Sequence, residues 1–205
     1  AGHAVDAKIG RQEIVIDGHR LFGHTGWTQG AQTSDAIRLT HAAGNHTLNY
    51  TYLMANEADS TTTSANSDAA AHVLYAQTQG VMGGTLSGIF VAMSDSSSNG
   101  GSADTEDWYT IGARQKGKLA GLDYRVEFYH QFGDAGVVGS TCACGITGIT
   151  TNNADSADRD AQMFGVRVGK TFANTKGKPS ITLWYDQLSG QDDDDAAGGD
   201  AAAAG

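Results

Sequence analysis

Apolar and polar residues alternate along most of the chain with a period of two. In the stretch QMFGVRVGKTF, for example, the apolar residues Phe164, Val166 and Val168 share one parity, whereas Arg167 has the other. Successive side chains of a strand point to opposite faces, so this pattern is typical of strands with one apolar and one polar face. Windows rich in Ala, Leu and Glu, which favour helices, are missing. The sequence therefore predicts an all-β fold.

About nine segments show this alternation, each close to the roughly 9 to 11 residues that a tilted membrane strand needs. They are Val5 to Asp17, Ser34 to Ala42, His46 to Ala55, Ala70 to Gln79, Thr85 to Ser94, Asp107 to Lys116, Leu122 to Phe132, Gln162 to Phe172 and Ser180 to Leu188. In the strands at 5–17 and 70–94 the alternation slips, which indicates a bulge.

Short and long connections between these segments alternate strictly. The short, turn-like ones are 43–45, 80–84, 117–121 and 173–179, and the long polar ones are 18–33, 56–69, 95–106 and 133–161. In an up-and-down sheet this order puts every short turn at one end and every long loop at the other, as in outer-membrane barrels. It favours an antiparallel transmembrane β-barrel, with a soluble antiparallel sandwich as the alternative.

In such a barrel the charged residues between apolar neighbours face a wet lumen, while the apolar residues face lipid. By parity, the candidates for the pore lining are Arg11, Arg38, Arg114, Arg125, Arg167, Glu13, Asp123 and Glu127. Guanidinium groups that line a channel attract carboxylates and bind them with two hydrogen bonds. Alternatively, each Arg pairs with an acidic residue on a neighbouring strand and braces the wall. The sequence leaves both roles open.

Composition narrows the class of function. Among 205 residues there are 28 Gly and one Pro, the formal net charge is -10 and the pI is about 4.9. Much of the acidic charge lies in the long polar segments, and a nucleic-acid-binding protein would instead carry a basic face. No apolar run approaches the roughly 18 residues of a membrane helix. We therefore expect neither a nucleic-acid partner nor a helical membrane anchor.

Motifs for catalysis and metal binding are not recognisable. The chain has no nucleophile elbow, phosphate-binding loop or H-E-x-x-H motif, so we expect no enzyme activity and no cofactor. Cys142 and Cys144 have no second pair of ligands nearby to complete a zinc site, and we interpret them as a structural or incidental pair. The run Asp192 to Asp195 lacks a calcium-loop pattern, and we interpret it as a solvated acidic loop.

One stretch is more specific than the rest. GRQEIVIDGHRLFGHTGWTQGAQTSDAIRL resembles a segment of the alginate-export family of outer-membrane porins, and the tail WYDQLSGQDD resembles a later strand and loop of that family. The matching positions are Gly10, Arg11, Gln12, Asp17, Arg20, Gly23, Trp27, Gln29, Asp35, Ala36 and Arg38. Thr28 departs from the pattern, because a basic residue is common at this position. In the loop motif Asp17, Arg20, Trp27 and Gln29, we expect Asp17 to bind Arg20 and Trp27 to pack in the turn or to stack on a sugar.

The resemblance implies a barrel of about eighteen strands, of which about nine are visible. We expect residues 1–190 to form a central part of one such barrel and 191–205 to be an acidic or Ala/Gly-rich loop or tail. The implied function is passive passage of anionic sugars or alginate-like polysaccharide through the bacterial outer membrane, in contact with lipid and lipopolysaccharide. A general diffusion porin for small polar solutes and a structural barrel in a surface assembly are the alternatives. The sequence does not predict the oligomeric state.

Overall fold

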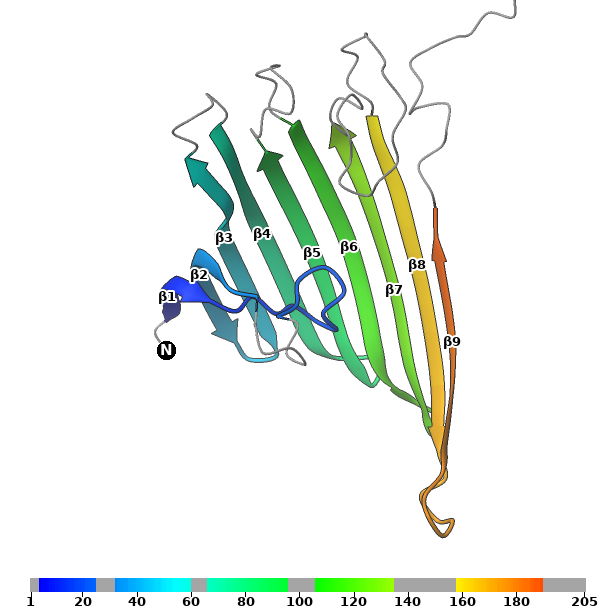
Figure 1. The fold of residues 1–205 in the computed structure, drawn as a ribbon. Helices are drawn as coiled ribbons and strands as arrows, with labels where there is room; N and C mark the ends of the chain where they lie inside the picture. Colours follow the sequence, from blue (N-terminus) through cyan, green and yellow to red (C-terminus); the bar gives the residue numbers. More distant parts are fainter. Residues whose placement is uncertain (1–3, 25–31, 60–65, 96–105, 135–157, 190–205) are drawn as a thin grey trace, which may run out of the picture.

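The computed structural model describes residues 4–24, 32–59, 66–95, 106–134 and 158–189. Within these ranges all regular elements are strands, joined in chain order into one antiparallel nine-stranded sheet (Figure 1). They are β1 (Val5–Gln12), β2 (Ser34–Ala43), β3 (His46–Asp59), β4 (Asn66–Val81), β5 (Gly84–Asp95), β6 (Glu106–Leu119), β7 (Leu122–Asp134), β8 (Asp158–Thr171) and β9 (Ser180–Leu188). The predicted all-β, up-and-down arrangement is confirmed.

The connections are sorted as the alternation of short and long segments predicts. The turns from β2 to β3, β4 to β5, β6 to β7 and β8 to β9 lie at one end of the sheet (Figure 1). At the other end, the strands continue to pair past the residues in which apolar and polar side chains alternate. Asp59, for example, is the register partner of Asn66. Backbone pairing does not require apolar side chains, so β3, β4, β6 and β8 are longer than the alternation predicts.

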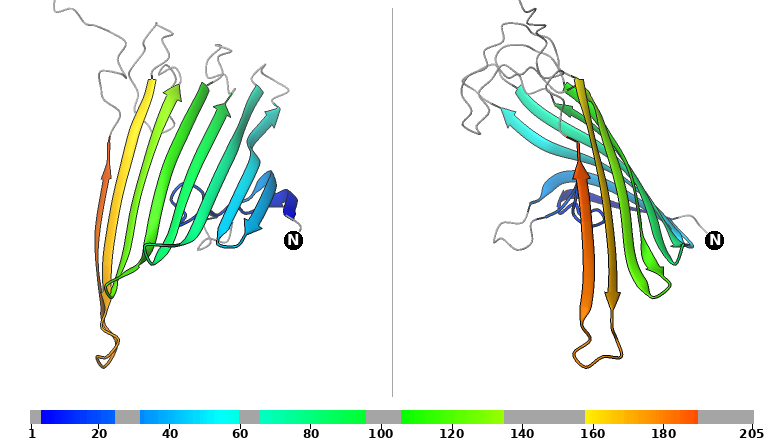
Figure 2. Two further views of the ribbon diagram at one scale, coloured as in Figure 1. Left: turned by 180° about the vertical axis from the view of Figure 1, so that it is seen from behind. Right: turned by 90° about the vertical axis from the view of Figure 1, so that its right-hand side faces the viewer.

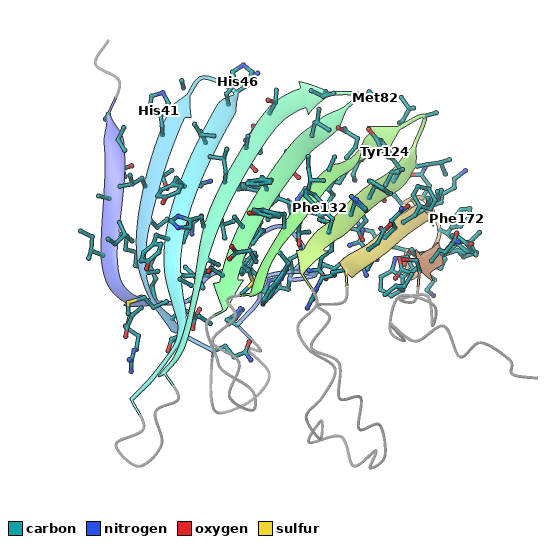
Figure 3. All side chains as sticks on the ribbon, turned by 90° about the horizontal axis from the view of Figure 1, so that it is seen from above. His41, His46, Met82, Tyr124, Phe132 and Phe172 are labelled. Atoms are coloured by element: carbon teal, nitrogen blue, oxygen red, sulfur yellow. The ribbon has the colours of Figure 1, made fainter. Side chains whose placement is uncertain are left out.

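The strands are tilted and the sheet is curved when it is seen from above (Figures 2 and 3). A part of the chain between β1 and β2, residues 13–24, crosses one face of the sheet in front of β4, β5 and β6 (Figure 1). We call the face that it covers the inner face and the opposite one the outer face. The part of the chain that the structure describes has no helix long and apolar enough to cross a membrane.

The outer face is apolar over β2 to β9. Large hydrophobic side chains are exposed there at alternate positions, including Ile37, Leu39, Leu48, Leu74, Leu86, Phe90, Ile111, Val126, Phe128, Phe132, Phe164, Val168, Phe172, Ile181 and Leu183. Phe90, Tyr109 and Phe132 form a continuous aromatic row, with ring centroids 6.2 Å and 5.5 Å apart. An apolar band with aromatic rings is typical of the lipid-facing surface of a membrane barrel.

The inner face holds the buried residues. Ile14 and Ile16 of the crossing segment pack on Ala36, Leu53, Ala71, Val73, Tyr75, Ile89, Val91 and Tyr129. Gly112 makes room for one of these, since a Cβ at this position would lie 2.2 Å from Cδ1 of Tyr129. The two residues are direct partners in the β6–β7 register. The residues of the inner face are therefore buried by the crossing segment and not by a second sheet.

The first predicted strand is too long. Strand β1 ends at Gln12, whereas the alternation extends to Asp17. Apolar residues change parity between Ile9, which is 75% exposed on the outer face, and Ile14, which is buried. Ile14 and Ile16, after Gln12, pack on the inner face, and the segment no longer pairs with β2. The predicted tail at 191–205 lies outside the described residues.

Candidate functional site in the lumen-facing side of the sheet

A tight turn in the crossing segment presents two charged residues to the inner face. The amide of His19 donates to the carbonyl of Ile16 over 3.2 Å, and the amide of Ile16 donates to the carbonyl of Phe22 over 3.3 Å. Asp17 and His19 have φ of 52° and 61°, a left-handed conformation that Asp and Asn tolerate better than most residues. Ile14 and Ile16 fix the approach to the turn by burial, so the positions of Asp17 and Arg20 are determined by packing.

Asp17 binds three neighbouring strands at once. Its carboxylate accepts hydrogen bonds from Tyr75 OH of β4 at 2.9 Å, Ser87 Oγ of β5 at 3.0 Å and Arg114 Nη1 of β6 at 3.0 Å. The side chains of Asp17 and Arg114 are 12% and 7% exposed. Charge-assisted hydrogen bonds are stronger than neutral ones, especially where water is excluded. Asp17 therefore ties the crossing segment to the sheet.

Arg20 makes a second tie, over a glycine. Its Nη2 lies 2.6 Å from Glu127 Oε1 of β7 and 3.3 Å from Asp186 Oδ2 of β9. Both acidic residues are register partners of Gly165 on β8, which lies between them. A Cβ at Gly165 would lie 2.8 Å from Asp186 Oδ1 and 3.1 Å from Glu127 Cγ. The missing side chain lets both carboxylates converge on one guanidinium.

Burial and charge act in opposite directions on Arg20. Burial alone would lower the pKa of its guanidinium, but the adjacent carboxylates of Glu127 and Asp186 outweigh it and raise the pKa above its ordinary value. Arg20 is therefore a permanent cation at this point.

The two ties join in one group of charges. Glu127 is only 3% exposed, and its carboxylate also lies 3.5 Å from Arg114 Nε and 3.4 Å from Arg125 Nη2. We call the set Asp17, Arg20, Arg114, Arg125, Glu127 and Asp186 the anchor cluster. Its three guanidinium groups and three carboxylates have no net charge when all are ionised. The cluster fastens the crossing segment without a net charge.

A hollow of about 700 Å³ opens beside the anchor cluster, toward the end with the short turns. Its lining includes the cations Arg114, Lys116, Lys118, Arg125 and Arg167 and the carboxylate Asp123. Asp123 is itself paired, since its Oδ1 lies 3.3 Å from Lys118 Nζ. Among the described residues, no ion pair is formed by Lys116 or Arg167. The hollow therefore has a net positive charge.

Most of the predicted pore-lining residues do share the inner face. Arg38, Arg114, Arg125, Arg167, Asp123 and Glu127 all lie there by register, and Arg38 is opposite the buried Thr51. Arg114 and Arg125 pair with carboxylates, which is the bracing role that the sequence left open, whereas Arg38 and Arg167 form no ion pair among the described residues. A role in a substrate path stays a prediction for all of them.

Arg11 and Glu13 are placed differently. Arg11 shares the outer face with Ile9, and its guanidinium binds Asp35 on β2 with two hydrogen bonds of 2.9 Å and 3.2 Å. Glu13 lies past the end of β1 in the crossing segment and is exposed. Parity assigned Arg11 to the lumen because it treated 5–17 as one unbroken strand, and this assignment is wrong. Glu13 does lie on the inner-face side, but on the crossing segment and not on a wall strand. In the sequence, the apolar residues lie at odd positions up to Ile9, whereas Ile14 and Ile16 lie at even positions. This change marks the end of the strand.

The predicted pairing of Asp17 with Arg20 in the loop motif is wrong. Asp17 and Arg20, both described, do not pair with each other but bind different strands. Trp27, Gln29, Cys142 and Cys144 lie outside the described residues. Sequence analysis missed Tyr75 and Ser87 as partners of Asp17, and no local signal identifies them because they are 58 and 70 residues away along the chain.

A metal centre is not evident in the part of the chain that the structure describes: no group of at least three His, Cys, Asp or Glu residues there could hold an ion.

The inner face thus combines a fastened crossing segment with a positively charged hollow, opposite an apolar outer face. Comparison with curated proteins and with solved structures found no match. A protein family described as alginate export matches residues 1–201, nearly the whole chain, in agreement with the resemblance carried by the segment from Gly10 to Arg38. The chain therefore belongs to the alginate export family, whose members are outer-membrane β-barrels for transport.

Proposed function

We propose that the chain forms part of the wall of a passive conduit for anionic carbohydrate in the bacterial outer membrane. The observation that carries the proposal is the hollow, in which Lys116 and Arg167 have no carboxylate partner among the described residues. Cations on a low-dielectric wall create a positive potential, which concentrates carboxylate-bearing solutes and gives them exchangeable binding sites. Membership of the alginate export family also supports passage of an anionic carbohydrate.

The outer face supports the proposed location. Its apolar residues suit the hydrocarbon of a membrane, and its aromatic row suits the boundary between hydrocarbon and head groups. The partners in this proposal are membrane lipid and lipopolysaccharide outside the barrel and anionic carbohydrate inside it. No catalytic step is part of the proposal, and neither is a cofactor.

Charge selectivity of the reconstituted natural protein tests the proposal. In planar bilayers under a salt gradient, we expect a reversal potential that shows anion preference, and a conductance that uronate oligomers block. The double variant Lys116→Gln/Arg167→Gln should lose most of this preference, because it removes two cations of the hollow that form no ion pair among the described residues.

Arg11→Gln is the matched control. It removes one cation of the same kind, but on the outer face, where Arg11 is paired with Asp35. Its reversal potential should equal that of the unmodified protein. Equal effects of the control and the double variant would contradict a role of the hollow.

A general diffusion porin is the second candidate, and the neutral anchor cluster is the observation that favours it. If the lumen were dominated by such balanced groups, small solutes of both signs would pass. Weak ion preference without block by uronates would support this candidate and exclude the first.

A further inference from the structure

Both tryptophans of the described chain lie under a guanidinium on the inner face. The Cζ of Arg159 is 4.7 Å from the centre of the Trp108 ring, and the Cζ of Arg167 is 4.6 Å from the centre of the Trp184 ring. The two pairs differ in accessibility, because Trp184 is 66% exposed and Trp108 is partly buried. Trp184 lies on β9, and all residues of this strand are exposed because no described strand pairs with its second edge. The feature of Trp184 that concerns a ligand is therefore its contact with Arg167, not its exposure.

The register places Trp184 at the end of a row of cations. Lys116 on β6 is opposite Arg125 on β7, Arg125 is opposite Arg167 on β8, and Arg167 is opposite Trp184 on β9. Neighbouring strands are about 4.8 Å apart, so the row extends over about 14 Å across the wall. It borders the hollow, which Thr182, two positions before Trp184 on the same face, also lines.

The row borders open space, because Lys116, Arg125 and Arg167 all line the hollow of about 700 Å³. The Arg167 guanidinium has no ion-pair partner in the described part of the chain, so its hydrogen-bond donors are available. Cation–π contact positions the planar guanidinium without using those donors.

This combination matches a uronate sugar better than it matches a simple anion. A pyranose ring has an apolar face of C–H groups and a polar edge, and a flat indole offers apolar contact at little conformational cost. The carboxylate of the sugar can then accept two parallel hydrogen bonds from a guanidinium. Inorganic anions and acyclic carboxylates can use the guanidinium but have no ring for the indole.

We propose that Trp184 and Arg167 form a subsite that holds one uronate ring, with its C–H face on the indole and its carboxylate on the guanidinium. The proposal rests on the proposed function and names the structural class of solute that this part of the wall recognises. Arg167 supplies charge recognition, whereas Trp184 supplies recognition of the ring. Lys116, which forms no ion pair among the described residues, extends the row with a position for the carboxylate of a neighbouring sugar unit.

The test compares ring-bearing and ring-free anions on the reconstituted natural protein. Uronate oligomers and acyclic polycarboxylate oligomers of matched charge are added, and the concentration for half-maximal block is measured for each. Trp184→Leu should weaken block by the uronates about ten-fold, which corresponds to about 1.4 kcal/mol, and leave block by the acyclic anions and the reversal potential unchanged. Arg167→Gln should weaken block by both probes.

Tyr185→Leu is the matched control, since it replaces the adjacent aromatic residue of the same strand on the outer face. It should change neither block. An unchanged uronate block in Trp184→Leu, or an equal loss for the two probes, would overturn the subsite.

Tryptophan fluorescence separates this outcome from failure of the proposed function. Uronates should quench part of the emission of the detergent-solubilised protein, and Trp184→Leu should abolish that part. Quenching without anion preference would retain the subsite and refute the conduit, whereas anion preference without Trp184-dependent quenching would retain the conduit and refute the subsite.

Discussion

Replacing Glu127 by Gln tests the anchor cluster most directly. The change keeps the size of a side chain that is 3% exposed, but it removes the negative charge that lies within 3.5 Å of Arg20, Arg114 and Arg125. The charge of the cluster then changes from 0 to +1, since three guanidinium groups face two carboxylates. Uncompensated charge in a poorly solvated site is strongly destabilising.

The magnitude follows from the exposure of the partners. Removing one member of a buried ion pair typically lowers the free energy of unfolding by about 3–5 kcal/mol. Arg20 is 30% exposed and keeps Asp186, and Arg125 is 19% exposed, so water and the remaining acid compensate part of the loss. We therefore expect a decrease of about 3 kcal/mol, at the lower end of this range.

Asp123→Asn is the matched control. It makes the same carboxylate-to-amide change on the same strand and face, but the Asp123–Lys118 pair is 49% and 80% exposed. Exposed pairs contribute only about 0–1 kcal/mol. Denaturant unfolding of the folded protein in detergent or lipid, followed by tryptophan fluorescence, measures both variants.

Equal losses of stability in Glu127→Gln and Asp123→Asn would show that the charge of Glu127 does not hold the anchor cluster together. A double-mutant cycle with Arg20→Gln adds a second criterion. If Arg20 and Glu127 are coupled, the two losses should differ from additivity by about 0.5–3 kcal/mol, whereas additive losses would mean that Arg20 does not depend on Glu127.

Three further predictions concern the wall itself, and denaturant unfolding checks each of them. Gly112→Ala should lower the free energy of unfolding by about 1–3 kcal/mol because its Cβ would overlap the Tyr129 ring, while Gly88→Ala, whose Cβ would have its nearest neighbour at 3.8 Å, should be close to neutral. Phe128→Arg puts a charge on the apolar outer face and should cost about 2–4 kcal/mol in a bilayer; a neutral result would argue against lipid contact there. Asp35→Asn should change stability by less than about 1 kcal/mol, because its pair with Arg11 is largely exposed, and a larger loss would show that this pair is shielded from water.

The sequence predicts the wall well because the wall obeys a local rule. A strand between lipid and water alternates with a period of two, so strands such as β5 and β7 are visible in the sequence without any knowledge of their neighbours. The family resemblance also points to the correct residues of the crossing segment, Asp17 and Arg20. Their partners are not predictable in this way, because they lie on strands that are distant in the sequence.

The misplacement of Arg11, and of Glu13 on a wall strand, has the same origin. An extended segment that pairs and an extended segment that only packs both alternate, and Ile14 and Ile16 would be apolar in either case. Only the change of apolar parity after Ile9 distinguishes them.

The position of the anchor cluster along the chain has a consequence for folding. The crossing segment precedes β2, yet its partners are as far as Arg114, 97 residues later than Asp17, and Asp186, 166 residues later than Arg20. Loop closure over such separations is entropically unfavourable before the intervening strands have formed. We therefore expect the crossing segment to dock after the strands that carry its partners have paired, and to be more accessible to proteases before that step than after it.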